Sequence, residues 1–285
     1  MHTLIISLVC SLIVGFYIKW LKINNLKDFC IFILSNYVIA VSLSFYFFND
    51  KITFNTLKNS FSIQVLALGF LLPTIFLLLN KSLKKSGLAK TDIFQRLSLI
   101  IPVVLSFYLF NEIFTFPKLI AIMLAFISIV LLLYKKSTNH GNSNIFYLLS
   151  VFIGYGVVDT LFKILATNKN IPYVVALFLI FGISAIVCFL FLFFVKGKIK
   201  SKTIFQGFIL GALNFCNIFF YLKAHKIFIE TPTLVFITMN LGVIIGGTII
   251  GTTYFKEKIS NSALIGIFTA ILSVLLLALI QLKLL

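Results

Sequence analysis

Acidic side chains are scarce in this 285-residue chain: seven aspartates and glutamates stand against 24 lysines and arginines, a formal net charge of +17. Arginine is almost absent, since Arg96 is the only one. In a water-soluble protein this charge would suggest nucleic-acid binding. Here the lysines fall mostly between apolar stretches or at their ends, where lysine reaches toward lipid headgroups. We therefore expect anionic membrane lipids as partners and no nucleic acid.

The motifs that mark enzymes and metal sites are also missing from the sequence. There is no Walker motif, no GxSxG and no HExxH. The four cysteines lie inside apolar stretches with neither CxxC nor metal-ligand spacing, and the three histidines are scattered. We therefore expect no enzyme activity, no cofactor and no metal site.

Apolar residues, by contrast, make up 61% of the chain, and the mean hydropathy is +1.14. A helix needs ~20 apolar residues to cross the ~30 Å hydrocarbon core of a bilayer. Segment length and the lack of strict apolar/polar alternation favour helices over a barrel. Ten segments are predicted, with short connections between them: Thr3–Ile18, Phe29–Phe48, Phe61–Leu79, Thr91–Phe110, Leu119–Tyr134, Ile145–Ala166, Ile171–Val195, Phe205–Leu222, Leu234–Phe255 and Ala263–Leu282.

The second half of the chain repeats the first. At an offset of 145 residues the following pairs align: Glu112 with Glu257, Ala125 with Ala270, and Ser128 with Ser273. Because each half holds five segments, an odd number, the second half must enter the membrane from the opposite face. The sequence predicts an all-α membrane protein with ten transmembrane helices in two inverted five-helix repeats (5+5), residues 1–136 and 145–285, joined by a loop at 137–144. A duplication retained only for packing is the alternative.

A resemblance to a known family is carried by the run LKKSGLAKTDIFQRLSLIIPVVLSFYLFNEIFTFPKLIAIMLAFISIVLLL. It is similar to the signature region of EamA-type proteins in the drug/metabolite transporter (DMT) superfamily. In that region a polar-headed fourth helix has a mid-helix proline (here Pro102) and ends in a glutamate (here Glu112). The second copy keeps Glu257 but has Gly247 in place of the proline. IGYGVVDTLFKIL, residues 153–165, also resembles the sixth helix of a bacterial subgroup.

The resemblance implies a transporter of a bacterial inner membrane, in which segments 1–4 and 6–9 surround a central cavity. It also implies cytoplasmic termini. With that orientation eight lysines would lie in cytoplasmic connections and fifteen in external ones, the reverse of the positive-inside rule. We follow the family topology and expect both termini in the cytoplasm.

Ionisable residues inside the apolar segments are candidates for contact with a solute, because an unpartnered charge costs ~2.5–3.5 kcal/mol to insert. Asp159 and Lys163 are four residues apart, as are Asp92 and Arg96, so each pair shares one helix face. Arg96 could also bind a carboxylate bidentately, which lysine cannot do. Protonation of Asp159 could couple to solute movement. A purely structural ion pair is the alternative in both cases.

Polar uncharged residues complete the predicted cavity. Gln95 aligns with Asn240, so two amides are expected to face each other across the centre; bonds to neighbouring helices are the alternative. The further candidates for the cavity are Asn36, Tyr37, Tyr155, Asn214, Asn217 and Thr238.

Several residues are expected to act structurally. Pro73 and Pro102 should kink their helices. Glu112 and Glu257 should end their helices at the interface beside Lys118 and Lys256, in anchoring or gating roles. Phenylalanines are expected mainly on lipid-facing surfaces. Four glycines are expected to allow close helix approach: Gly154, Gly156, Gly246 and Gly247.

The function that the sequence and the resemblance favour is secondary transport of a small, amino acid-like metabolite by alternating access, with export as the expected direction. Proton coupling and facilitated diffusion both fit. A carrier or flippase for a lipid-linked precursor is one alternative, and a non-transporting membrane scaffold with a packed, dry centre is another. A homodimer is left open.

Overall fold

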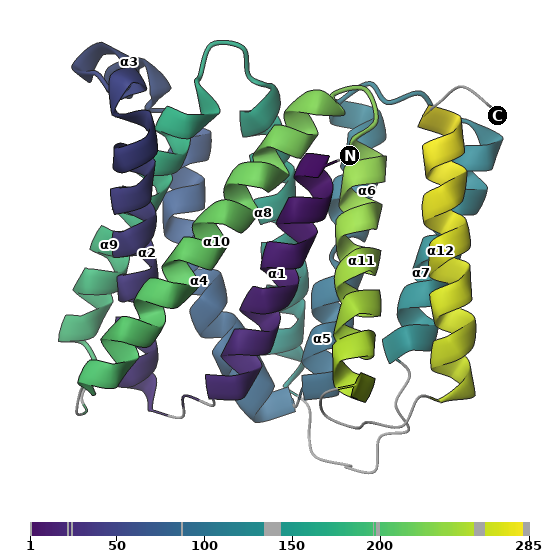
Figure 1. Ribbon diagram of the computed structural model, residues 1–285, viewed down its shortest axis with the longest axis horizontal. Helices are drawn as coiled ribbons and strands as arrows, with labels where there is room; N and C mark the ends of the chain where they lie inside the picture. Colours follow the sequence, from purple (N-terminus) through teal and green to yellow (C-terminus); the bar gives the residue numbers. More distant parts are fainter. Residues whose placement is uncertain are drawn as a thin grey trace. The chain divides into compact units, whose positions relative to one another are not determined.

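The computed structural model describes residues 2–21, 23, 25–86, 88–133, 144–195, 197, 200–253 and 260–281. These residues form helices and no strand (Figure 1). The elements are α1 (His2–Leu21), α2 (Leu26–Phe48), η1 (Asn49–Lys51), α3 (Phe54–Ser60), α4 (Ile63–Ser86), α5 (Leu88–Leu97), α6 (Ile100–Leu109), α7 (Phe116–Leu133), α8 (Ile145–Thr167), α9 (Tyr173–Phe193), α10 (Ser201–Ile227), α11 (Pro232–Thr253) and α12 (Asn261–Gln281).

Helices lie at all ten of the predicted apolar segments. By length and composition, seven helical stretches of the described residues could cross a membrane, and three further apolar helices are shorter. The described part of the chain is therefore all-helical, with several helices that could span a membrane, while the full set of ten spans stays a prediction. The connection at residues 49–62 also holds the short helix α3, which the sequence did not predict. Its start is fixed by a capping box, in which Thr53 and Thr56 each accept from the other's backbone N–H.

The fourth predicted segment is divided into α5 and α6 by a turn at Ser98 and Leu99. The cause is Pro102, which has no N–H to donate to the Ser98 carbonyl and whose ring would crowd that oxygen in a regular helix. The Ser98 carbonyl instead accepts from the N–H of Ile101 at 3.0 Å, a spacing typical of a 3₁₀ turn. The predicted kink at Pro102 is confirmed, in the stronger form of a break.

Helix α4, by contrast, continues through Pro73. The proline leaves the carbonyl oxygen of Gly69 without its usual helical donor. The Ser184 hydroxyl on α9 donates to that oxygen at 2.9 Å. A β-carbon added at Gly69 would lie 2.6 Å from Cγ2 of Ile183, so this close approach of α4 and α9 requires glycine. A kink at Pro73 stays a prediction.

The chain divides into two compact units, one of Met1–Thr74 with Leu161–Lys226 and the other of Ile75–Thr160 with Ile227–Leu285. We call them unit 1 and unit 2. The boundaries fall inside α4, directly after Thr74, and inside α8, directly after Thr160. Each unit therefore combines helices from both halves of the sequence, so these units are not the predicted sequence repeats, which stay a prediction.

Aromatic side chains form a cluster inside unit 1, where α2 packs against α9. Phe215 and Phe219, one turn apart on α10, lie 6.0 Å apart between ring centroids. The surrounding rings come from α2 and α9: Phe47, Phe48, Tyr173 and Phe181. Phe181 and Phe215 are buried and depart from the expectation that phenylalanine mainly faces lipid, whereas Phe47 is 60% exposed. Offset and tilted ring pairs of this kind stabilise the contact between helices.

Two glycines set the distance between α10 and α2. Gly207 and Gly211, four residues apart, lie on one face of α10. A β-carbon at Gly207 would lie 2.5 Å from the carbonyl oxygen of Phe32, and one at Gly211 would lie 2.5 Å from that of Asn36. This is the small-xxx-small pattern by which membrane helices approach closely.

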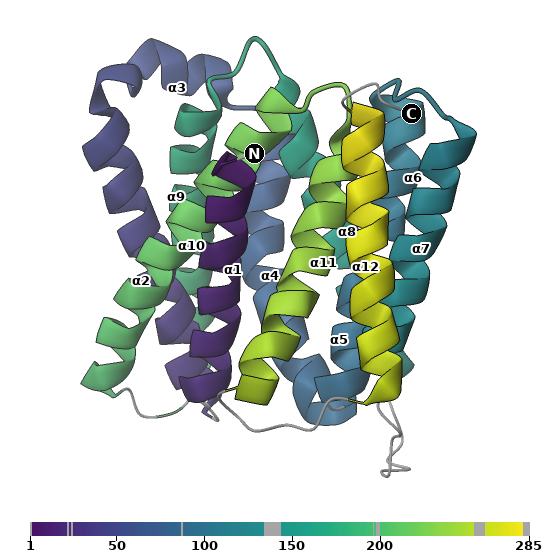
Figure 2. The same ribbon diagram turned by 45° about the vertical axis from the view of Figure 1, so that its right-hand side comes forward.

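In unit 2, α7 and α12 lie side by side (Figures 1 and 2). The Ser128 hydroxyl donates to the carbonyl oxygen of Gly266 at 2.8 Å, and the Ser273 hydroxyl donates to that of Ala121 at 2.7 Å. At the offset of 145, Ser128 corresponds to Ser273 and Ala121 corresponds to Gly266. The two hydrogen bonds are thus one interaction made twice, with the two helices exchanged.

This reciprocity fixes the relative direction of α7 and α12. On each helix the serine and the acceptor carbonyl are seven residues apart, which is about 10 Å of rise. Each serine can reach the acceptor of the other helix only if the helices run antiparallel. Ala125 and Ala270, which lie between the two bonds, are fully buried, as a close crossing requires.

A buried ion pair joins the start of α7 to the start of α11. Lys118 Nζ lies 3.1 Å from Glu112 Oε1, and both side chains are almost fully buried. The other carboxylate oxygen, Oε2, accepts from the backbone N–H of Thr233 at 3.2 Å and from its hydroxyl at 2.6 Å. The expected position of Glu112 beside Lys118 is confirmed, while its anchoring or gating role stays a prediction. Its sequence counterpart Glu257 lies outside the described residues.

Candidate functional site

Helix α5 presents the only arginine of the chain. Arg96 Nε lies 3.5 Å from Asp92 Oδ1, one turn earlier on the same helix. The Arg96 side chain is 20% exposed and the Asp92 side chain is 38% exposed. The predicted Asp92–Arg96 pair is confirmed, and its partial exposure distinguishes it from the buried Glu112–Lys118 pair.

Helix α8 brings a phenol and a second carboxylate to the same place. The Tyr155 hydroxyl lies close enough to Arg96, Asp92 and Asp159 to interact with them electrostatically. Tyr155 and Asp159 are one turn apart on α8 and half-buried. The structure thus joins four of the predicted site residues from two helices of unit 2. We call Asp92, Arg96, Tyr155 and Asp159 the charged cluster.

The glycines on either side of Tyr155 explain how α8 comes this close. A β-carbon at Gly154 would lie 2.9 Å from the end of the Ile75 side chain on α4. One at Gly156 would lie 2.5 Å from Cδ1 and 2.7 Å from Cβ of Ile101 on α6. Close approach at both glycines was predicted and is confirmed. It was wrong for Gly247, which has nothing within 4 Å.

The charged cluster has donors and acceptors of both signs. The guanidinium of Arg96 can bind a carboxylate with two parallel hydrogen bonds. The carboxylates of Asp92 and Asp159 can accept from an ammonium group, and the Tyr155 hydroxyl can donate or accept. This set suits a solute that carries both an ammonium and a carboxylate group.

Three further predicted residues of unit 2 lie on α5 and α11. The Asn240 amide donates to the carbonyl oxygen of Phe236 on its own helix at 3.1 Å. Gln95 is half-buried, and an arrangement in which it faces Asn240 across a cavity stays a prediction. The Thr238 hydroxyl is buried and has no hydrogen-bond partner among the described residues.

The predicted amides of unit 1 join helices to one another. Asn214 Nδ2 on α10 donates to Asn36 Oδ1 on α2 at 3.3 Å. The Ser7 hydroxyl on α1 donates to Asn217 Oδ1 and to its backbone oxygen, both at 2.9 Å. Asn36 and Asn214 are buried. These contacts match the alternative in which polar residues tie helices together.

Tyr37 and Lys163, the two other predicted residues of unit 1, are fully buried. The Tyr37 ring stacks on Phe181 at 6.3 Å. Lys163 Nζ donates to the carbonyl oxygen of His225 at 3.3 Å. Since α10 ends at Ile227, that oxygen is one of the last four of the helix, where a cation is favoured. The predicted Asp159–Lys163 ion pair stays a prediction.

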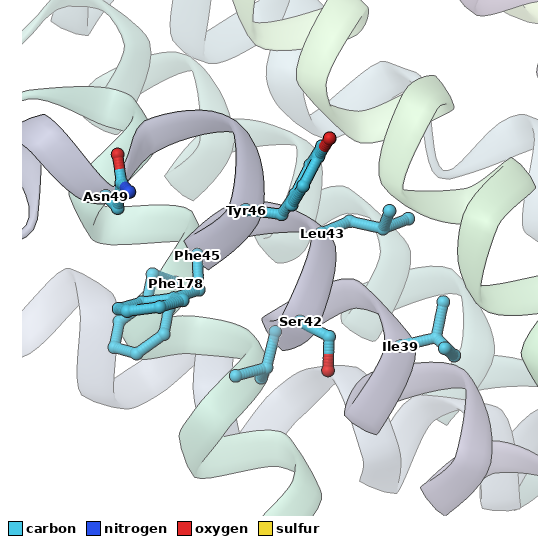
Figure 3. A pocket seen from close by; sticks show the side chains of 8 residues that line it. Ile39, Ser42, Leu43, Phe45, Tyr46, Asn49 and Phe178 are labelled. Carbon is cyan, nitrogen blue, oxygen red and sulfur yellow. The ribbon is translucent and has the colours of Figure 1, made fainter.

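An open hollow of about 700 Å³ lies along α2 in unit 1. Figure 3 shows Phe45 and Phe178 side by side on one side of α2, with Ile39, Leu43 and Tyr46 on the other. Its polar groups are the side chains of Ser42 and Asn49 and the Tyr46 hydroxyl, and none of the predicted site residues lines it. The hollow holds no charged side chain that could bind a charged solute.

Within the described part of the chain, no three histidine, cysteine or acidic residues gather in a way that could hold a metal ion. The sequence missed three features of this structure: the Gly207/Gly211 contact, the reciprocal serine bonds and the aromatic cluster. The first had a signal, since glycines four apart in an apolar helix predict close packing. The reciprocal bonds could have been suspected from the alignment of Ser128 with Ser273.

Comparison with known proteins identifies several similar chains. Residues 55–134 match the model of the EamA-like transporter family. The chain is 37% identical over 277 residues to an uncharacterized protein of Haemophilus influenzae (strain ATCC 51907 / DSM 11121 / KW20 / Rd), and the match covers 94% of both chains. A crystal structure described only as that of a protein matches 99% of this chain and 97% of its own, with a TM-score of 0.79 at 12% identity. This last likeness concerns the fold alone.

Proposed function

The chain belongs to the EamA-like transporter family of the DMT superfamily, and we propose that it is a secondary transporter for a small zwitterionic solute of the amino-acid type. Membership of the family makes it a multi-pass membrane protein and a transporter by class. The solute, the direction of transport and the coupling are the subject of the proposal.

The charged cluster is the observation on which the proposal depends. Asp92, Arg96, Tyr155 and Asp159 come together on helices that are otherwise apolar, where ionisable groups are expensive unless they serve a solute or an ion path. Because the Asp92–Arg96 pair is partly exposed, each of its two groups could release the other and bind a solute instead. A solute carboxylate would bind Arg96 and its ammonium group would bind Asp92, while Asp159 would take up the proton.

We further propose the ten-helix inverted arrangement, with both termini in the cytoplasm of a bacterial cell. The antiparallel packing of α7 and α12 through two equivalent serine bonds supports an inverted relation between the halves. Inverted repeats provide two states of similar energy, one open to each side of the membrane, and so permit alternating access.

Asp159 is the proposed proton-binding residue, and its test is flux in proteoliposomes. A panel of amino acids is loaded, and efflux is followed with and without a pH gradient. Asp159→Asn should abolish the stimulation by the gradient and leave solute exchange intact, because exchange needs no net proton movement. Asp50→Asn, on the exposed helix η1, is the matched control and should behave as the unmodified protein. Flux in Asp159→Asn that responds to pH as before would rule out coupling through this residue.

Arg96→Lys tests the solute site separately from coupling. The substitution keeps the positive charge but removes the planar guanidinium group, which can donate two parallel hydrogen bonds to a carboxylate. Loss of one charge-assisted hydrogen bond, worth about 1.5–3 kcal/mol, should raise the KM for a carboxylate solute roughly 10- to 100-fold. The response to pH should persist. An unchanged KM would place the solute elsewhere, and no flux of any solute with the unmodified protein would favour the scaffold alternative.

A further inference from the structure

A cleft of about 360 Å³ lies in unit 1 where α1 ends and where α2 and α10 begin. Figures 1 and 2 show these three helix ends at the same lower end of the unit. The residues that line it are Leu21, Ile23, Asn25, Asp28, Lys200, Lys202, Thr203 and Gln206. None of them belongs to the charged cluster, so the cleft is separate from the proposed solute site.

The charge of the cleft is positive. Its lining holds two lysines and one aspartate, which gives +1. The aspartate is already engaged: Asp28 is 4% exposed, and its Oδ1 accepts from the backbone N–H of Lys200 at 3.1 Å. Lys200 and Lys202 are exposed, so their ammonium groups are open to an anion. The sequence places two more lysines, Lys196 and Lys198, just before them.

The remaining lining residues fit the layer between the lipid tails and water. Leu21 and Ile23 give the cleft an apolar wall, and Thr203 and Gln206 add polar groups. On α1, Tyr17 and Trp20 stack at 6.4 Å, and Trp20 is 58% exposed. Tryptophan and tyrosine near a helix end are typical of the membrane–water interface.

We propose that this cleft binds an anionic phospholipid, with the headgroup phosphate between Lys200 and Lys202 and the upper part of an acyl chain against Leu21 and Ile23. Lysine ammonium groups bind phosphate as point charges, and Gln206 can donate to a phosphate or glycerol oxygen. A lipid bound here would hold the start of α10 to the start of α2, where the backbone N–H of Lys200, the residue before α10, already donates to Asp28 of α2.

Trp20 provides the measurement, because it is the only tryptophan of the chain and precedes Leu21 of the cleft wall. The full chain is placed in nanodiscs of phosphatidylglycerol and phosphatidylcholine, with bromine on the acyl chains of one lipid at a time. Brominated chains quench tryptophan fluorescence on contact. We expect brominated phosphatidylglycerol to quench Trp20 as strongly as if this lipid were enriched beside Trp20, over its share of the bilayer, on the order of tenfold. The enrichment is expected because two lysines near the membrane surface attract anionic lipid.

The variant Lys200→Gln with Lys202→Gln should lose this preference. Its matched control is Lys81→Gln with Lys85→Gln, which removes two exposed lysines of α4 and should keep it. In the unmodified protein, salt at about 1 M should weaken the preference, because an exposed ionic contact is screened. The salt titration uses only the unmodified protein, so its result does not depend on whether a variant folds.

Results of two kinds would overturn the proposal. One is equal quenching by the two brominated lipids in the unmodified protein, or a preference that survives in the Lys200/Lys202 variant. The other is relief of quenching by millimolar glycerol 3-phosphate in the surrounding solution, which would show that the cleft prefers a free phosphate to a lipid.

Discussion

At the scale of single residues, the buried pair of Glu112 and Lys118 offers a sharp test of what stabilises unit 2. Glu112→Gln would leave the Lys118 ammonium buried without a counter-charge, which typically costs about 3–5 kcal/mol. We expect a marked fall in the free energy of unfolding, measured by denaturant titration in detergent. Adding Lys118→Met to Glu112→Gln should recover much of the loss, since the lone buried charge is then gone.

The control for this test is Glu230→Gln, the same substitution at an exposed position. It should change the free energy of unfolding by no more than about 0.5 kcal/mol. A loss at Glu112→Gln as small as that at Glu230→Gln would mean that the pair contributes little. No recovery in the double variant would assign the loss to the bonds between Glu112 and Thr233.

Residue-scale prediction from the sequence worked where partners lie close along the chain. The Asp92–Arg96 pair and the position of Glu112 beside Lys118 follow from spacings of four and six residues. Asn36 and Asn214 are 178 residues apart, and no local pattern indicates that they bind each other. The sequence could identify these amides as candidates, but it could not decide between a solute and a neighbouring helix as their partner.

At the scale of elements, close packing of α10 on α2 depends on glycine at position 211. Gly211→Ala would place a β-carbon 2.5 Å from the Asn36 carbonyl oxygen, a backbone atom that cannot move aside without its helix. We expect a cost of about 1–3 kcal/mol, as for other overpacked positions, seen as a lower midpoint of unfolding.

Gly182→Ala on α9 is the matched control, because nothing lies within 4 Å of the added carbon. There alanine should be neutral or stabilise α9 by up to ~1 kcal/mol through its higher helix propensity. The same midpoint for both variants would contradict the role assigned to Gly211.

Proline shows why element boundaries were harder to predict than the elements themselves. Pro73 and Pro102 have the same chemistry, yet α4 continues and the fourth segment breaks. The difference lies in the neighbours: the freed Gly69 carbonyl finds the Ser184 hydroxyl of another helix, whereas the freed Ser98 carbonyl is satisfied within its own turn. A tertiary donor of this kind cannot be read from the local sequence.

At the scale of the whole molecule, hydropathy predicted where helices form because a bilayer demands long apolar segments with internally satisfied backbones. It did not predict that the compact units would mix the two halves of the sequence. Side-chain contacts decide that grouping: Asn36 with Asn214 and Ser128 with Gly266 each join residues more than 130 apart.

The inverted arrangement predicts on which side of the membrane the connections lie. Five proposed spans separate Asn55 on α3 from Gly197 before α10, so the two positions should face opposite sides. Single cysteines at these positions, in a chain whose four native cysteines are replaced, are labelled in sealed vesicles of known orientation with a membrane-impermeant maleimide.

Asn55→Cys should react only from the cytoplasmic side, given cytoplasmic termini, and Gly197→Cys only from the other. Asn25→Cys should share the side of Gly197→Cys, because six spans separate them and both neighbour the lysine-lined cleft. Labelling of all three cysteines from one side would mean that the halves are not inverted. Labelling of Asn55→Cys from outside and of the other two from the cytoplasm would keep the inverted repeat and reverse only its orientation, in agreement with the lysine count.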